Sequence, residues 1–241
     1  MTLASCDSRK TAGENPFFTE WDTPHGVPPF DKILPEHFMP AFERGMSLHE
    51  AEIDAITSNK DEATFENTIL AYDNAGQMLA QTELVFGMLC AAETNDRMQA
   101  LQEQAMPLLA AHRDKIRLDD KLFVRVKEVY DRRAALGLDA EQMRLLQKTY
   151  DSFVRAGALL DAEQKARLKE INGQLSLTAV KFGNNILAEN NNFVLELKSD
   201  ELDGLPAGIR DAAREKAQQM GKGDKWVFTL HKPSLIPLLT Y

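Results

Sequence analysis

The sequence has few cysteines, a deficit of basic residues and no long apolar run. Its two cysteines, Cys6 and Cys90, are too few for a disulfide framework, and no Cys-x-x-Cys pair is present to bind a structural zinc. No apolar run approaches the roughly 20 residues that span a bilayer. The 37 acidic residues outnumber the 28 basic ones, for a net charge of −9. This charge repels phosphate backbones, so we expect no nucleic-acid partner.

The motifs of common hydrolases are missing as well. A zinc protease motif places two histidines one helical turn apart, with a glutamate beside the first. The nearest match is His49-Glu50-Ala51-Glu52-Ile53, in which Ile53 takes the place of the second histidine. We interpret His49 and Glu50 as a surface pair on an amphipathic helix. No Gly-x-Ser-x-Gly turn and no phosphate-binding loop occurs.

The remaining titratable side chains suggest structural roles. His37 precedes a helix start and His112 is followed by Arg113 and Asp114, so both are predicted to cap a helix or to face solvent. Cys90 follows Phe86 on a helical face and is predicted to be a buried, inert thiol. We therefore assign no catalytic and no metal-binding residue in this chain.

Residues 1–33 are predicted to form an irregular arm, because proline and glycine recur there. Leu3-Ala4-Ser5-Cys6 resembles the cleavage end of a bacterial lipoprotein signal, which makes Cys6 a candidate lipidation site. The polar residues after Cys6 would then form a tether to the membrane. The charged and apolar regions of a signal peptide do not precede the motif, so an accidental match stays open. The compartment follows this choice: cell envelope if Cys6 is lipidated, and otherwise cytoplasm.

Residues 34–190 are predicted to be a helical domain, because apolar residues recur at helical spacing from Pro35 onward. We expect helices from Pro35, from a Thr64 N-cap through Leu89, from Asn95 and from Asp120 to Leu136. Pro107 should kink or split the third of these helices.

Two further helices begin with the same tetrapeptide, Asp-Ala-Glu-Gln, at residues 139–142 and 161–164. In each, the aspartate and glutamine can form a capping box. An apolar stripe follows each cap, and we expect the two helices to pack antiparallel along these stripes. Leu175→Asp should then destabilise the protein. The stripes consist of Met143, Leu146, Tyr150, Phe153 and Gly157, and of Leu168, Ile171, Leu175, Thr178 and Phe182.

Residues 191–241 are predicted to be a small α+β segment. Residues 193–197 and 225–230 have the composition of strands, with a helix of about 14 residues starting at Pro206 between them. The last residues, 234–241, are apolar and carry no stop signal, so we expect the chain to be cut from a longer one. The predicted fold class is mainly α: an antiparallel, bundle-like helical domain with a small β element near the carboxy terminus.

An ordered set of short stretches resembles the amino-terminal part of the thimet-oligopeptidase-like zinc metallopeptidases, and most closely its peptidyl-dipeptidase members. The match runs from about Asn15 to the last residue. It rests on Asn15-Pro16-Phe17, residues 29–33, 40–46, 65–69 and 136–139, Arg144-Leu145-Leu146, residues 153–158 and residues 182–187.

The resemblance implies a function that the residues themselves do not. Family members have a deep channel that admits oligopeptides, and their zinc site, a His-Glu-x-x-His helix plus a later glutamate, lies in the carboxy-terminal half. Zinc would be the cofactor of the full-length parent, which would release carboxy-terminal dipeptides from oligopeptides. This chain would form one wall of the channel and would bind no zinc and be inactive alone. The alternative is a free-standing helical module that binds peptides or a partner, with a lipid anchor at Cys6.

Overall fold

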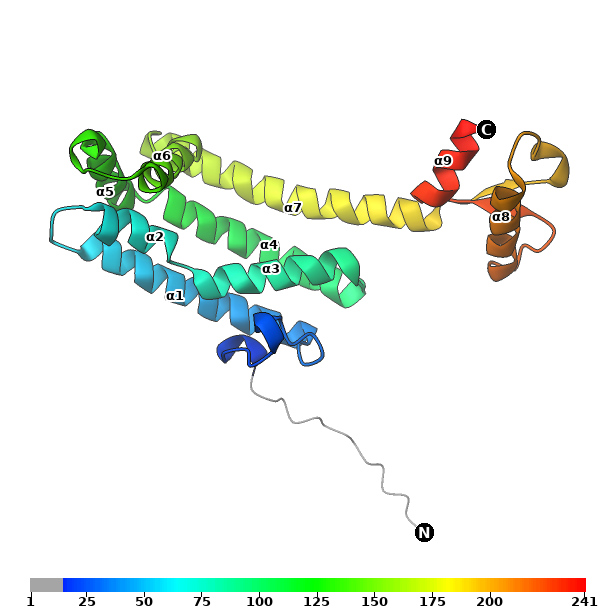
Figure 1. Cartoon of the computed structure of the whole chain (residues 1–241), viewed down its shortest axis with the longest axis horizontal. Helices are drawn as coiled ribbons and strands as arrows, with labels where there is room; N and C mark the ends of the chain where they lie inside the picture. The colour runs from blue at the N-terminus through cyan, green and yellow to red at the C-terminus, as the bar shows by residue number, and fades with distance from the viewer. Residues whose placement is uncertain (1–14) are drawn as a thin grey trace, which may run out of the picture. The chain divides into compact units, whose positions relative to one another are not determined.

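The computed structural model describes residues 15–241 and is mainly helical, with a small antiparallel sheet near the carboxy terminus, as predicted (Figure 1). The described residues divide into two compact units, and the first ends at Val180. The domain limits predicted at residues 33 and 190 stay predictions. Cys6 and its predicted tether lie outside the described residues.

The first unit is built from helices that follow one another along the chain. α1 packs against α3, α4 and α5, and α6 packs against α5. Gly45 brings α1 and α3 close together, because a Cβ at this position would lie 3.0 Å from the Leu79 Cα atom. The helices are α1 (Phe38–Ser58), α2 (Ala71–Asp73), α3 (Gln77–Ala92), α4 (Asp96–Arg117), α5 (Asp120–Asp131), α6 (Ala140–Arg155) and the part of α7 (Ala162–Asn192) up to Val180, the rest of α7 belonging to the second unit.

Side-chain caps begin these helices where the sequence predicts them. The Thr64 hydroxyl accepts a hydrogen bond from the Asn67 N–H at 3.1 Å, which starts the π-helical turn Phe65–Leu70. The Asn95 side chain caps α4. Both predicted capping boxes are confirmed: Asp139 with Gln142, and Asp161 with Gln164.

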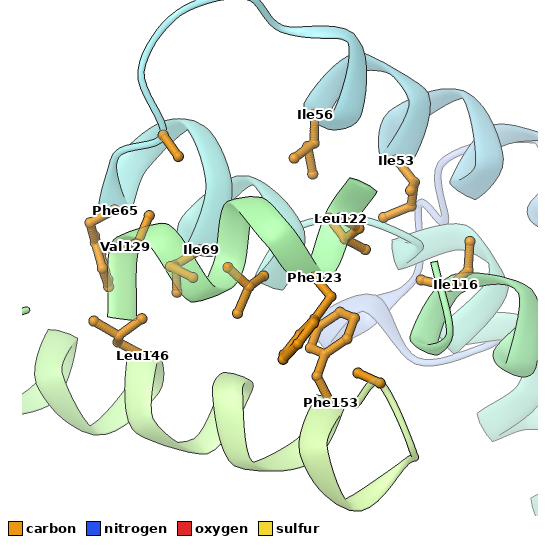
Figure 2. Close-up of a cluster of buried hydrophobic side chains, with 13 residues drawn as sticks. Ile53, Ile56, Phe65, Ile69, Ile116, Leu122, Phe123, Val129, Leu146 and Phe153 are labelled. Atoms are coloured by element: carbon orange, nitrogen blue, oxygen red, sulfur yellow. The ribbon is translucent and has the colours of Figure 1, made fainter. Parts of the chain in front are cut away.

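Two hydrophobic clusters hold the first unit together. One cluster is largely aromatic: Phe17 from the amino-terminal arm packs against Phe38, which lies beside Phe42 and Phe86. The second cluster joins α1, α5 and α6 (Figure 2). There Leu146 and Phe153 of α6 point toward side chains of α5 and of the turn Phe65–Leu70 (Figure 2). The contact of Phe17 with Phe38 in the first cluster thus fixes the amino-terminal arm to the helices of the first unit.

Two helix boundaries differ from the prediction, and one helix predicted to be kinked or split is continuous. The helix expected from Thr64 to Leu89 is interrupted at Gly76, whose φ of +75° is left-handed and ends the helical path. The helix expected to reach Leu136 ends at Asp131 and continues as a 3-10 turn. α4 continues through Pro107, so the predicted split does not occur; Ala105 and Leu109 on either side of it are both buried in the aromatic cluster.

The predicted pairing of α6 with α7 along their apolar stripes is wrong. Leu146 and Phe153 of the α6 stripe are buried, but in the cluster with α5, and within the described part of the first unit (residues 15–180) no element packs extensively against α7. On α7, Ile171 is 42% exposed, Leu175 is 63% exposed and Phe182 is 66% exposed. Because a charge at an exposed position stays hydrated, the expected destabilisation by Leu175→Asp does not follow for this chain.

The second unit is a two-stranded sheet covered by a helix. β1 (Leu195–Leu197) pairs antiparallel with β2 (Trp226–Phe228), shorter than the strands predicted, and Leu195 lies opposite Phe228. α8 (Ala207–Gln219) packs against β2 and buries Ala213 against Phe228. The final apolar residues form α9 (Lys232–Thr240), a helix that the sequence reading missed.

Candidate functional site

The most notable polar cluster of the first unit lies between α1 and α4. His112 of α4 is buried, with 5% of its surface exposed, and its Nε2 atom lies 3.0 Å from Nδ1 of His49 on α1. One imidazole can donate its N–H to the other, so the pair makes a hydrogen bond across the helix interface. His112 Nδ1 lies 3.5 Å from a Glu50 oxygen.

Charged groups surround the two imidazoles. The other Glu50 oxygen lies 2.8 Å from Lys115 Nζ, and the hydrogen bond from Lys115 lowers the pKa of Glu50. Burial lowers the pKa of His112, and burial together with the neighbouring His112 lowers that of His49. The histidines are therefore favoured in their neutral forms at neutral pH, which suits a buried hydrogen bond.

A tight turn closes the cluster on the α3 side. Gly76 N–H donates to a Glu52 carboxylate oxygen at 2.7 Å, which ties the start of α3 to α1. A Cβ at Gly76 would lie 2.9 Å from His49 Nδ1. Both the left-handed backbone and the closeness of His49 therefore require glycine here.

The prediction for His112 is wrong, while that for His37 is confirmed. His37 Nδ1 accepts a hydrogen bond from the Leu34 N–H at 3.0 Å and so caps the turn before α1. His112 lies inside the protein, and the sequence held a signal for this. Ala105, Leu109, His112 and Ile116 are spaced four, three and four residues apart, and all four are buried. The polar residues that follow His112 point elsewhere on the helix.

The histidine pair was compared with the ligand set that a zinc ion takes in proteins. Two imidazoles meet in the cluster, but among residues 15–241 no group of three or more histidine, cysteine or acidic side chains could hold a metal ion. A zinc site in proteins takes at least three such ligands. Glu50 is engaged by Lys115, and the two imidazoles are engaged with each other. The cluster is therefore assigned a structural role in joining α1, α3 and α4.

A second feature is a groove between α4 and the first half of α7. Its volume is about 580 Å³. Its apolar lining includes Met106, Leu168 and Leu175, and three arginines, Arg113, Arg117 and Arg155, line it as well. Asp114 is the one acidic residue in the lining. The groove is thus apolar and cationic, in a chain of net charge −9.

Few polar contacts cross this groove. Asn172 of α7 donates to Asp114 of α4 at 2.8 Å. Arg113 is paired with Glu83 at 2.9 Å. Arg155 is exposed, and within residues 15–241 it has no ion-pair partner. The groove therefore offers an unpaired guanidinium beside exposed apolar surface, which is a combination suited to binding a polypeptide.

Two further features are the state of the Cys90 thiol and the apolarity of the helices. Cys90 is half-buried and not fully enclosed, and burial raises the pKa of its thiol, which disfavours the reactive thiolate. Across residues 15–241, every helix falls short of the length or apolarity needed to cross a membrane.

Comparison with known proteins finds relatives that are peptidases. No protein-family model matches the chain. A dipeptidyl carboxypeptidase of Escherichia coli (strain K12) is 37% identical over 226 residues, which cover 93% of this chain and 33% of the relative. A dipeptidyl carboxypeptidase of Salmonella typhimurium is 35% identical over 226 residues, with the same shares covered. An oligopeptidase A of Escherichia coli is 24% identical over 220 residues, covering 91% of this chain and 32% of the relative. The chain spans about a third of the length of these relatives.

Proposed function

We propose that this chain is the amino-terminal part of a peptidase of the dipeptidyl carboxypeptidase family. In the longer zinc peptidase, it would form a wall of the substrate channel. The full-length protein would remove dipeptides from the free carboxyl ends of oligopeptides. The chain by itself would position substrate and support the catalytic part, without performing the chemistry.

The observation that carries the proposal is the identity of 37% along 93% of the chain. The same chain is only 24% identical to an oligopeptidase A over a similar length. This difference favours a dipeptide-releasing peptidase over an oligopeptidase that cuts inside its substrates.

The zinc chemistry is proposed to belong to residues outside this chain. A zinc ion in a peptidase polarises the scissile carbonyl and supplies a hydroxide nucleophile. Among residues 15–241 no group of three or more histidine, cysteine or acidic side chains could hold a metal ion, which supports assigning no step of the reaction to them. We therefore expect residues 1–241 alone to be inactive.

The test compares the full-length protein with residues 1–241 on an oligopeptide with a blocked amino terminus. Mass spectrometry would identify the products. We expect the full-length protein to release carboxy-terminal dipeptides, to lose this activity with a chelator and to regain it with zinc. Residues 1–241 should release nothing. Chelator-sensitive dipeptide release by residues 1–241 would refute the assignment of the chemistry to the missing part.

A matched substrate separates the two kinds of peptidase. The same oligopeptide with an amidated carboxyl end lacks the terminal carboxylate that a dipeptidyl carboxypeptidase is expected to need. The full-length protein should process the free acid and leave the amide intact. Equal cleavage of both peptides would favour the oligopeptidase reading instead.

A further inference from the structure

The stripe of α7 poses a packing problem that the described residues do not solve. Ile171 and Leu175 have the spacing of core residues and yet are 42% and 63% exposed. Leu175 also lines the groove between α4 and α7. Exposed apolar residues that form a continuous strip beside a groove mark a binding surface more often than isolated ones do.

The charges of the groove indicate the chemistry of its occupant. The lining contains three arginines, Arg113, Arg117 and Arg155, and one carboxylate, that of Asp114. Arg113 is already paired with Glu83, whereas Arg155 has no ion-pair partner among residues 15–241. A segment that carries apolar side chains on one face and at least one carboxylate near Arg155 would complement this surface.

The length of the relatives indicates where this segment comes from. The chain covers 33% of the dipeptidyl carboxypeptidases it resembles, so two-thirds of such a protein lies outside it. A segment tethered in the same polypeptide binds at a high effective concentration, and so even a modest groove would be filled.

We propose that the groove between α4 and α7 is the docking surface for an acidic, amphipathic segment from the remaining two-thirds of the full-length peptidase. This inference rests on the proposed function, because it requires the longer protein. Leu175 would anchor the apolar face of that segment, and Arg155 would pair with its carboxylate.

The first test measures how accessible position 175 is in each form of the protein. Leu175→Cys would be introduced into residues 1–241 and into the full-length protein, and alkylation at this position would be followed by peptide mass spectrometry. Leu84→Cys is the matched control, since Leu84 is 66% exposed on α3 and does not line the groove. We expect alkylation at position 175 to be about tenfold slower or more in the full-length protein, and alkylation at position 84 to be equally fast in both.

The second test uses a charge at the same positions. Leu175→Asp should leave the melting temperature of residues 1–241 unchanged and lower that of the full-length protein by about 5 °C or more, because the charge would be buried only there. Leu84→Asp should be neutral in both forms. Arg155→Gln is a milder variant for the case that full-length Leu175→Asp fails to fold, and it should lower the melting temperature of the full-length protein alone.

Four outcomes would overturn the proposal. The first two are equal alkylation rates at position 175 in the two forms, and equal protection of positions 84 and 175 in the full-length protein. The third is a dimer of residues 1–241 that Leu175→Asp converts to a monomer. The fourth is a full-length Leu175→Asp or Arg155→Gln variant with a raised KM for peptide and an unchanged melting temperature. The last two would assign the groove to a second copy or to substrate. Dipeptide release by the unmodified full-length protein is measured separately. If position 175 is protected but no dipeptide is released, the proposed function is refuted and the docking surface is not.

Discussion

The stripes of α6 and α7 allow one matched pair of substitutions to test the packing of the first unit. The sequence places Leu146 and Leu175 on the apolar stripes of two helices that begin with the same cap. The structure separates them completely: Leu146 is 0% exposed and Leu175 is 63% exposed. Leu146→Ala and Leu175→Ala in residues 1–241 are therefore the same chemical change in opposite environments.

The magnitude follows from what each substitution removes. Leu146→Ala deletes about three methylene-sized groups from a closed cluster, worth about 2.4 kcal/mol of transfer free energy. The cavity left beside Val129 and Phe65 adds to this, and so a loss of about 3 kcal/mol of unfolding free energy is expected within a usual range of about 2–5 kcal/mol (Figure 2). Leu175→Ala should stay within about 0.5 kcal/mol of the parent, because its side chain is already hydrated.

Urea unfolding followed by far-UV circular dichroism would measure both free energies, with thermal melting as a second readout. A loss of about 3 kcal/mol corresponds to about 6–12 °C for a domain of this size. Equal losses for the two variants would mean that α7 packs against the rest of the unit as its sequence suggests. A neutral Leu146→Ala would refute the core described for α5 and α6.

Three further perturbations test the polar framework of the first unit. Arg125 donates hydrogen bonds to the carbonyl oxygens of Asn59 and Asp61 and to the Asn67 side chain. Arg125→Met should therefore lower the free energy of unfolding, measured in urea, by about 2–4 kcal/mol. The control Arg167→Met removes an exposed ion pair and should lower it by under about 0.5 kcal/mol. Gly76→Ala should cost about 1–3 kcal/mol, because alanine is strained at this φ and would collide with His49; a stability equal to that of the parent would contradict the turn described. Because burial lowers the pKa values of His49 and His112, the unfolded chain takes up more protons below pH 6.5, so stability should be full above this pH and fall as the pH drops through the lowered values. The combined variant His49→Gln and His112→Gln should lose less stability between pH 7.5 and 5.5 than the parent does, and an unchanged pH dependence in urea unfolding would show that other groups cause it.

Local signals in the sequence were sufficient for much of the helical framework. Thr64, Asn95, Asp139 and Asp161 cap helices because a short polar side chain can bond to N–H groups two or three residues ahead, and this needs no distant partner. The strand composition around Trp226 and the helix stop at Gly221 are local in the same sense.

The candidate site was harder to predict from the sequence than the helices were. His49 and His112 are 63 residues apart, and their contact depends on α1 packing against α4. The spacing of His112 with Leu109 and Ile116 indicated a buried position, but the polar residues after it suggested solvent. The groove has the same origin, since its arginines come from α4 and from the end of α6.

The sequence by itself determined where most of the helices begin and which class of fold they build. Tertiary structure alone decided which apolar stripe is buried. The stripes of α6 and α7 have the same periodicity, because periodicity records only that a helix has an apolar side. Whether that side meets α5, as in α6, or remains exposed, as in α7, depends on which neighbours the rest of the fold brings within contact distance.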